Sequence, residues 1–454
     1  MRQRDPWAVA ALAAGLVIAP APALAASGSV SLAGIPLDFL LFALVLVGVA
    51  TLHNHTLKVA LAGAVGISLY QLLVTGFKAG PGLAGLASHF GHEWVTLANL
   101  LGLLLGFALL ADHFEKSRLP EVLPHLLPDD WKGGFVLLVG VFVISGFLDN
   151  IAAAMIGGTM AKVLFRRKVH IGFLAAIVAA SNAGGAGSVV GDTTTTMMWI
   201  AGTSPLQVLE AYVGGVVALA IFGVFAAKQQ HRYQPIACDD TPGVRVELAR
   251  LAVVVAVLGA AIAANVWFNL EDPAMLDRLP VIGGAVVISL LLMARLRAPQ
   301  WSLLPGALKG SVFLLSLVWC ASLMPVEHLP AATWQTTMGL GFLSAVFDNI
   351  PLTSLAIHQN GYDWGFLAFS VGFGGSMIWF GSSAGVALAG MYPEARSLAQ
   401  WLRHGWHVAL GFVAGYLVML AVLGWHPHML KRAPAGLGAS VGALYAPMSP
   451  VSVV

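Results

Sequence analysis

Three aspartates stand inside apolar runs of this 454-residue chain, where an ionised carboxylate needs a partner. Asp149 and Asp348 each belong to an Asp-Asn-Ile triplet, and Asp192 lies between a glycine-rich stretch and a run of threonines. An ionised aspartate at the centre of a bilayer costs roughly 2.5–3.5 kcal/mol on insertion scales, so it survives only where it faces protein, water or an ion. These positions predict a site for a cation, for protons, or for both in competition.

Glycines and neutral oxygens accompany the three carboxylates. Glycine allows backbone to leave helical geometry and to approach a ligand, and such backbone is tolerated at membrane depth only where it lines a cavity. We therefore expect two broken helices with hinge glycines Gly184, Gly185, Gly191, Gly374, Gly375 and Gly381. The expected ion or substrate ligands are Asp149, Asn150, Asn182, Asp192, Thr193, Thr194, Asp348, Asn349, Ser382 and Ser383, with the three aspartates as the hypothetical sodium ligands.

The composition requires a membrane setting for this site. Hydrophobic residues make up 58% of the chain and charged residues only 10%, which excludes an ordinary soluble domain. The formal net charge of +2 gives no reason to expect a nucleic-acid partner. Cys238 in a polar loop and Cys320 in an apolar run indicate no disulfide framework.

The apolar runs form two series of six elements. The first series is 36–54, 57–77, 94–112, 133–164, 170–201 and 208–228, and the second is 248–268, 279–296, 309–325, 333–357, 364–392 and 403–424. The fourth and fifth elements also share motifs: "FLDNIAAAMI" corresponds to "VFDNIPLTSLAI", and "GGAGSVVGDTTTT" to "GGSMIWFGSSAGV". Shared motifs in the same order predict an internal repeat.

The distribution of Lys and Arg decides the orientation of the two repeats. If each fourth element is a re-entrant hairpin, seventeen of the 23 basic residues fall on one face and four on the other, with Arg2 and Arg4 in the N-terminal segment. The positive-inside rule makes the richer face cytoplasmic. We predict an all-α polytopic membrane protein with two inverted repeats. Each has five transmembrane helices and one re-entrant hairpin, and the helix after each hairpin is broken.

The chain divides accordingly. Residues 1–25 form a signal-peptide-like segment or a first transmembrane helix. The first repeat is expected over 30–230, a cytoplasmic linker over 231–247, the second repeat over 248–425 and a flexible C-terminal tail over 426–454. Both mature termini are predicted on the outer face of a bacterial inner membrane.

Several polar residues have simpler interpretations. Thr195 and Thr196 fit ligand and packing roles equally, because threonines in apolar helices commonly bond to their own backbone carbonyls. His358 is better explained as a satisfied buried histidine than as a proton shuttle. His89 and His92 are interpreted as surface residues of a loop over 81–93, without the partners of a metal site.

The motif residues resemble a known family. "SNAGGAGSVVGDTTTTMMW" and "FLDNIAAAMIGGTM" are similar to the NhaD-type sodium/proton antiporters, which belong with arsenite permeases and citrate or dicarboxylate carriers in the ion transporter superfamily. The resemblance covers 133–200 strongly and 340–390 more loosely. It implies a secondary transporter of the elevator type, usually a homodimer, with alternating access and no cofactor.

The departures from the superfamily pattern bear on the substrate. Its carboxylate carriers have Ser-Asn-Thr at the hairpin tips, whereas both tips read Asp-Asn-Ile here. Three aspartates without Lys or Arg in the motif segments favour a cation over citrate or succinate. The expected function is sodium/proton antiport in a lipid membrane. The alternatives are a sodium-coupled citrate or dicarboxylate carrier and an arsenite permease. An enzyme is not expected, because the sequence offers no nucleophile with a paired base.

Overall fold

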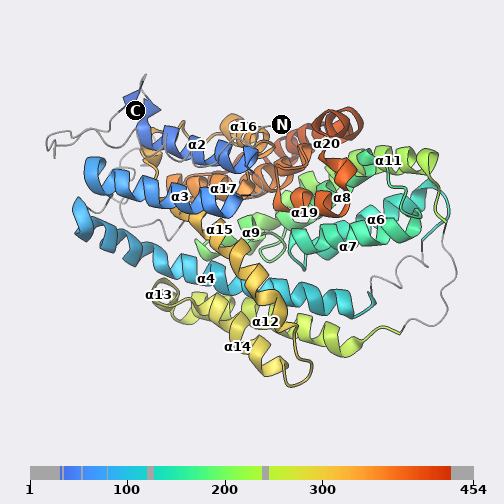
Figure 1. Ribbon diagram of the computed structural model, residues 1–454, viewed down its shortest axis with the longest axis horizontal. Helices are drawn as coiled ribbons and strands as arrows, with labels where there is room; N and C mark the ends of the chain where they lie inside the picture. Colours follow the sequence, from blue (N-terminus) through green and yellow to red (C-terminus); the bar gives the residue numbers. More distant parts are fainter. Residues whose placement is uncertain are drawn as a thin grey trace, which may run out of the picture.

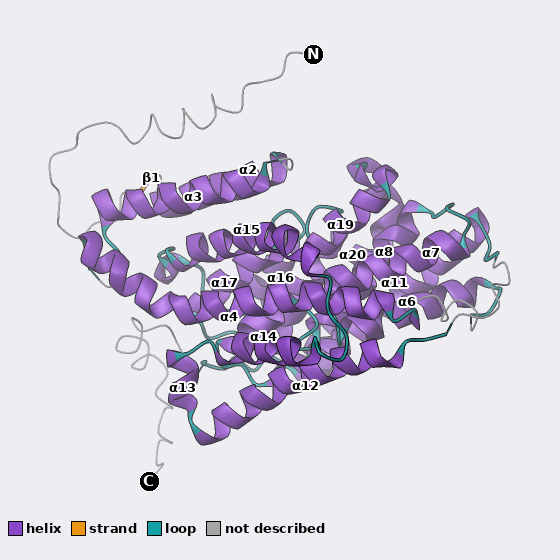
Figure 2. Cartoon of the chain, turned by 60° about the horizontal axis from the view of Figure 1, so that its bottom comes forward, coloured by secondary structure: helices purple, strands orange, loops and turns teal. Residues whose placement is uncertain are grey.

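A computed structural model describes residues 31–32, 35–52, 55–78, 80–119, 127–237 and 245–430. Figure 2 shows that the described chain is almost entirely helical. A two-stranded antiparallel sheet, β1 (Ser31–Leu32) with β2 (Ile35–Pro36), precedes the first described helix. The predicted segment 1–25, Cys238 in the linker and most of the predicted C-terminal tail lie outside the described residues.

The first half contains the expected order of elements. It comprises α2 (Leu37–Thr51), α3 (Thr56–Tyr70) continued by η1 (Gln71–Thr75), α4 (Gly82–Lys116), α6 (Trp131–Ser145), α7 (Asn150–Leu164), α8 (Ile171–Ala186), α9 (Thr193–Ile200), α10 (Pro205–Leu209) and α11 (Ala211–Tyr233). The short α6 and α7 pack against each other and occupy the predicted fourth element.

The second half repeats that order. It comprises α12 (Leu248–Glu271), α13 (Pro273–Arg278), α14 (Val281–Met293), η3 (Trp301–Leu303), α15 (Leu304–Ser322), η4 (Val326–His328), α16 (Trp334–Ser344), α17 (Asn349–Gln359), α18 (Trp364–Ala368), η5 (Phe369–Phe373), η6 (Gly375–Met377), α19 (Ser383–Met391), η7 (Pro393–Arg396) and α20 (Leu398–Leu423). Here α16 and α17, with 11 residues each, take the place of α6 and α7.

The helices form two groups. The first three elements of each half pack together, with α4 against α12, α14 and α15, and α3 against α2 and α15. The later elements form a second group, in which α8, α11 and α20 contact one another and α6 contacts α8 and α11. Figure 1 shows α6, α7, α8 and α11 at one end of the molecule and α3 and α13 toward the other, with α12 and α14 below the long helix α4.

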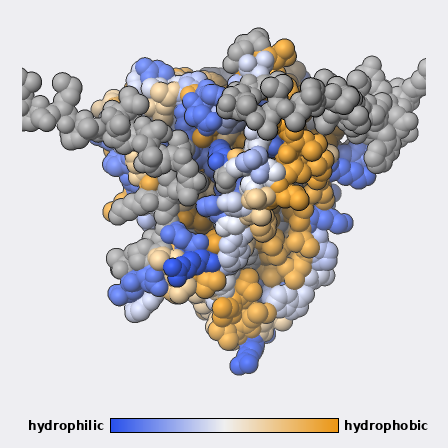
Figure 3. Space-filling model, turned by 90° about the vertical axis from the view of Figure 1, so that its left-hand side faces the viewer, coloured by the Kyte–Doolittle hydropathy of each residue, from blue (hydrophilic) through white to orange (hydrophobic). Residues whose placement is uncertain are grey.

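Length and composition identify a multi-pass membrane protein. Six described helices are long and apolar enough to cross a bilayer, whereas α6, α7, α8 and α14 are shorter apolar helices. Large apolar side chains remain exposed along α12 and α14, for example Val255 and Ile288. Figure 3 shows hydrophobic residues gathered in a band on the side that faces left in Figure 1. Apolar side chains on the outside of apolar helices are suited to lipid contact.

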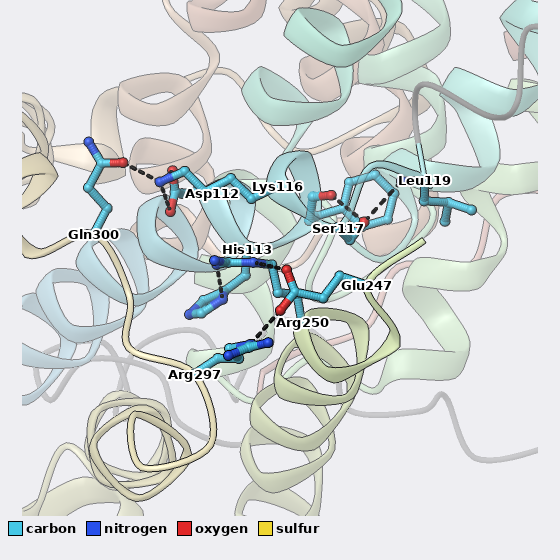
Figure 4. Close-up of polar contacts among 10 residues, drawn as sticks. Asp112, His113, Lys116, Ser117, Leu119, Glu247, Arg250, Arg297 and Gln300 are labelled. Carbon is cyan, nitrogen blue, oxygen red and sulfur yellow. Dashed lines mark hydrogen bonds and ion pairs between the residues drawn. The ribbon is translucent and has the colours of Figure 1, made fainter. Parts of the chain in front are cut away.

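A polar cluster joins the first group across the two halves. In Figure 4, Glu247 at the start of α12 pairs with Arg250, whose Nε lies 2.8 Å from the carboxylate, and also with Arg297. The backbone N–H of Glu247 donates to the carbonyl of Ser117, at 2.8 Å, just after α4. Lys116 pairs with Asp112 at 2.7 Å in the last turn of α4. The C-terminal end of α4 is thereby fastened to the start of α12.

The prediction of a loop over 81–93 was wrong. Helix α4 begins at Gly82, directly after Pro81, and continues through this whole stretch. Its glycines and histidines weaken the local helical signal, but Gly85, His89 and Glu93 form a buried face. The interpretation of His89 as a surface residue was also wrong, because its ring is buried and its Nε2 lies 3.0 Å from the hydroxyl oxygen of Ser322.

Candidate functional site

The turns between the paired short helices place the two Asp-Asn motifs in equivalent positions. Asp149 is the N-cap of α7 and accepts from the backbone N–H of Ile151 at 3.2 Å. Asp348 is the N-cap of α17 and accepts from the N–H of Ile350 at 3.0 Å. An N-cap carboxylate satisfies an otherwise unpaired helix N–H and complements the positive end of the helix. Each aspartate therefore begins its own helix.

The two predicted helix breaks are present. Helix α8 ends at Ala186 and α9 begins at Thr193, with Asp192 as its N-cap. Asp192 accepts from the backbone N–H of Thr194 at 2.9 Å and from its hydroxyl at 3.0 Å. In the second half α19 begins after Ser382, whose hydroxyl accepts from Gly385 N–H at 3.3 Å. Four helix N-termini are thus capped by three aspartates and one serine.

Side-chain amides link these N-termini. The Asn150 amide donates to the Asp192 carboxylate at 2.9 Å and to the Asn182 side-chain oxygen at 3.1 Å. The Asn182 amide donates across the two halves to the hydroxyls of Ser376 and Ser382, both at 3.0 Å. All five side chains are buried. The first Asp-Asn tip and both breaks therefore meet in one hydrogen-bonded network.

The remaining predicted ligands lie at the margin of this network. The Ser383 hydroxyl donates to the Asp348 carboxylate at 3.3 Å. Asn349 is buried beside it, and Thr193 is only partly buried. Thr195 and Thr196 bond to the carbonyl oxygens of Ser188, Val189 and Asp192, so their hydroxyls hold the break loop together. Of their two interpretations, the structure favours packing.

The three aspartates do not form one ligand cluster. Within the described ranges, no group of three His, Cys, Asp or Glu side chains lies close enough to hold a metal ion. Asp192 is nevertheless near enough to Asp149 and Asp348 for their charges to interact. Each carboxylate is oriented by its own helix, and like charges repel, which keeps the three apart. A cation at this site would need amide, hydroxyl or carbonyl oxygens in addition.

The six motif glycines lie where neighbouring backbone segments approach each other too closely for a side chain. A Cβ on Gly185 would lie 2.6 Å from the carbonyl oxygen of Gly191, and one on Gly375 would lie 2.7 Å from that of Gly381. Gly184 and Gly374 face carbonyls of α6 and α16 in the same way, at 2.0 and 2.2 Å. None of the six has a positive φ. Glycine is needed here because the backbones of the broken helices contact the neighbouring backbones. The same contacts occur in both halves.

The halves differ in charge at equivalent positions. Aligned on their glycine pairs, Asn182 and Asp192 of the first half correspond to Gly372 and Ser382 of the second. A Cβ on Gly372 would lie 3.7 Å from the Asp192 carboxylate and only 3.0 Å from the Cβ of Ala186, so glycine allows close packing next to that carboxylate. Ser376, which the sequence analysis missed, supplies a hydroxyl to Asn182. The first half carries the buried charge, and the second supplies small and neutral groups around it.

A cavity of about 500 Å³ reaches Asp149. Its lining comes mainly from α4, α7 and α15, with Leu303 of η3 and Met391 of α19, and it includes Asp112 and the exposed Glu115 in the last turns of α4. The other lining side chains are mainly apolar, such as Phe107 and Leu314. The cavity therefore joins one Asp-Asn tip to the end of α4 that lies beside Arg250 of α12.

Comparison with known proteins is consistent with this architecture. No family model matches the chain. The chain is 27% identical over 370 residues to "Sodium/proton antiporter 1" of Arabidopsis thaliana, an alignment that covers 73% of this chain and 61% of that relative. It is 26% identical over 365 residues to "Sodium/proton antiporter 2" of the same plant, covering 72% and 83%. It is 25% identical over 397 residues to "Na(+)/H(+) antiporter NhaD" of Alkalimonas amylolytica, covering 74% and 79%.

The fold defines an all-α polytopic membrane protein. Among its relatives, the chain spans 61% of the length of the first plant antiporter and about four fifths of the other two. These similarities confirm the resemblance to the NhaD-type sodium/proton antiporters that the motif residues indicated.

Proposed function

We propose that this protein is a secondary transporter that exchanges sodium ions for protons across the membrane. The observation that carries the proposal is the buried Asp192 carboxylate, which accepts hydrogen bonds from Asn150 and Thr194 where four helix N-termini meet. The similarity to proteins named as sodium/proton antiporters supports sodium and protons as the exchanged ions.

The charges of the helix ends and the aspartates at this junction support competition between sodium and a proton. Four helix N-termini with partial positive charge meet the C-terminal ends of α6, α8 and α16, which carry partial negative charge, so the helix-end charges largely offset one another. The three aspartates, when ionised, therefore leave the junction negative, which favours a cation. When one aspartate takes up a proton, the negative charge decreases by one unit and the attraction for sodium weakens. Sodium and a proton then compete, which is the requirement for exchange.

The geometry also supports alternating access. The short helix pairs α6–α7 and α16–α17 are suited to re-entrant hairpins in inverted repeats, since 15 or 11 residues are too few to cross a bilayer. The cavity at Asp149 supplies a route to the face that the Lys and Arg distribution makes cytoplasmic. The group containing α4, α12, α14 and α15 is the proposed scaffold. The group with the hairpins and broken helices is the proposed moving part of an elevator, in a homodimer.

The alternative function, transport of citrate or a dicarboxylate, has one specific observation in its favour. Helix N-termini bind anionic groups, and transporters use them to hold substrate carboxylates. Here, however, three of the four N-termini already carry an aspartate of their own. A citrate or dicarboxylate carrier would have to neutralise these aspartates with several cations first. Arsenite is neutral, so charge does not discriminate against it.

The test is proton release by the purified full-length protein. Adding sodium in weakly buffered solution is expected to release protons, and apparent sodium affinity should weaken as the pH falls, because competition for one site is reciprocal. Exchange in vesicles is then compared for sodium, lithium, potassium, citrate and arsenite. Sodium binding without proton release, together with tighter citrate or succinate binding in sodium, would overturn antiport in favour of the carboxylate carrier.

A further inference from the structure

The cavity that reaches Asp149 is large enough for a small organic molecule. Its volume of about 500 Å³ lies within the range of about 300–1,000 Å³ that is typical of small-molecule sites. A single sodium ion would fill only a small part of this space. The cavity therefore has room for a ligand other than the exchanged ion.

Apolar side chains make up most of the cavity walls. Phe107 of α4 supplies an aromatic surface, and Met155 and Ile156 come from α7. Leu314 of α15 lies on the remaining wall. Transfer of apolar surface from water to such an environment is favourable. The walls therefore suit a ligand whose body is an aromatic ring or an alkyl chain.

The charged groups in the lining are all acidic. They are Asp149 at the first Asp-Asn tip and Asp112 and Glu115 in the last turns of α4, and the described residues that line the cavity include no Lys or Arg. Lys116 pairs with Asp112 at 2.7 Å and partly neutralises it. The hydrogen bond described for the Asp149 carboxylate comes from the backbone N–H of Ile151 at 3.2 Å, so this carboxylate can still accept from a ligand. A cationic group beside Asp149 would be stabilised.

The cavity lies between the two groups of helices. Helices α4 and α15 belong to the proposed scaffold, whereas α7 is part of the first hairpin and has Asp149 as its N-cap. Glu115, Thr159 and Gly310, one from each of these helices, line the cavity and are exposed, so the cavity is open to the surface there. A ligand inside it would contact scaffold and hairpin together.

We propose that this cavity binds amphipathic organic cations, which carry one ammonium group on an aromatic or alkyl body, and that the bound cation blocks exchange. The ammonium group contacts the Asp149 carboxylate, and the body packs against Phe107 and Leu314. The charge and volume of the ligand then exclude sodium from Asp149, and the ligand holds α7 against α4. Binding follows from the cavity alone, whereas the block of exchange rests on the proposed function.

Three probes with the same phenylbutyl body test the selection for a cation. At about pH 8, phenylbutylamine is a cation, phenylbutanol is neutral and phenylbutyrate is an anion. Binding to the purified full-length protein in detergent is measured by equilibrium dialysis, and uptake by protein-free micelles is subtracted. Phenylbutylamine should bind at least about tenfold more tightly than phenylbutanol, because a hydrogen bond to a charged group contributes about one tenfold step in affinity or more. Phenylbutyrate should bind most weakly.

Two variants test the place of binding. Asp149→Asn removes the charge, and asparagine remains a good N-cap for α7. It should weaken phenylbutylamine binding about tenfold and leave phenylbutanol binding unchanged. Ala108→Trp places a large side chain among the lining residues and should weaken binding of both probes. Asp129→Asn, the same change at an exposed position before α6, is the matched control and should keep all three affinities at the parent values.

The site is rejected if phenylbutylamine and phenylbutyrate bind equally to the parent, or if Asp149→Asn binds phenylbutylamine as tightly as the parent does. If Ala108→Trp fails to accumulate, Asp149→Asn and the three probes decide the question without it.

Inhibition is measured on sodium-dependent proton release by the parent protein. At equal concentrations, phenylbutylamine should reduce this release more than phenylbutanol does. Release that continues unchanged when phenylbutylamine saturates the cavity would overturn the block. Failure of the exchange function is distinguishable, because the three probes would still bind in the expected order to a protein that releases no protons when sodium is added.

Discussion

The amide of Asn150 donates to the carboxylate of Asp192 at 2.9 Å, although 42 residues separate them and they belong to different helix termini. This bond places the first Asp-Asn tip directly on the first helix break. It also leaves Asp149, the neighbour of Asn150, free to cap α7 and to line the cavity. The roles of the two adjacent tip residues are therefore separate: Asn150 binds the buried acid, and Asp149 lines the cavity.

Asp192→Asn is expected to reduce exchange strongly while the protein still folds. Asparagine keeps the size and an acceptor oxygen for Thr194, but it loses the charge and the proton site. We expect exchange to fall on the order of 100-fold, since contacts to a charged group contribute up to about 3 kcal/mol. Exchange is measured in vesicles alongside membrane-protein yield.

Asp129→Asn is the matched control, because this residue is exposed in the loop before α6. It should leave exchange at the parent rate. A well-expressed Asp192→Asn protein that exchanges ions normally would show that Asp192 has only a packing role.

Gly185→Ala and Gly375→Ala should impair both stability and exchange. In each case the added methyl group would lie within 2.7 Å of a backbone carbonyl oxygen, which cannot rotate away as a side chain can. Overpacking of this kind costs about 1–3 kcal/mol. The readout is the thermal unfolding midpoint in detergent together with the exchange rate.

Gly140→Ala supplies the control for both glycines. Gly140 lies within α6, and a Cβ there would meet no atom within 4 Å. Alanine at an open helical position should stabilise by about 0.5–1 kcal/mol. Equal effects of Gly140→Ala and Gly185→Ala would show that close approach at the breaks is not what requires glycine.

The sequence predicted those parts of the fold that depend on local composition. Apolar runs indicated the order of helices, and the motif around Gly191 and Asp192 located the break, because a carboxylate inside an apolar run is rarely tolerated in an unbroken helix that faces lipid. The prediction of a loop over 81–93 was wrong for the converse reason. The helical preference there is weak, and burial of His89 and Glu93 against residues far along the chain determines the outcome.

The candidate site was predicted less completely than the fold. The participation of Asn182 was predicted, but its bonds to Ser376 and Ser382, 194 and 200 residues away, could not be. The expectation of three aspartates as sodium ligands overlooked that each one caps a helix. Capping requires knowing where a helix begins to within one residue, and sequence patterns do not locate boundaries that closely.

Stability should depend on pH through the cluster in Figure 4. Hydrogen bonds from Arg250 and then Arg297 lower the pKa of Glu247 in the linker. Because the folded-state pKa lies below the unfolded one, this carboxylate stabilises the protein above about pH 4.5. The contribution is lost as the pH falls through the lowered pKa.

Glu247→Gln should therefore lower the unfolding midpoint at pH 7, and its difference from the parent should shrink as the pH falls below about 4.5. Thermal unfolding in detergent over a pH series measures this. Glu271→Gln, exposed at the other end of α12, should show no such trend. A constant difference between Glu247→Gln and the parent at all pH values would rule out the ionic origin of the effect.

The last prediction concerns the two short helix pairs, which we propose are re-entrant hairpins of opposite orientation. Both ends of a re-entrant hairpin reach the same face, whereas the two ends of a spanning element reach opposite faces. Asp129 and Lys168 flank α6–α7, and Ala331 and Gln359 flank α16–α17. Single cysteines at these four positions, in protein lacking both native cysteines, should react with a membrane-impermeant maleimide in pairs. The first pair should label from the cytoplasmic face.

The second pair should then label from the outer face, because the Lys and Arg distribution predicts that the second repeat is inverted. Right-side-out and everted vesicles distinguish the two faces, and a permeant maleimide confirms that each cysteine is reactive. Labelling of cysteines at Asp129 and Lys168 from opposite faces would make α6–α7 a spanning element. Labelling of all four from one face would keep the hairpins but make the repeats parallel. In that arrangement both tips would approach the site from the same side, and exchange by closing one tip while opening the other would lose its structural basis.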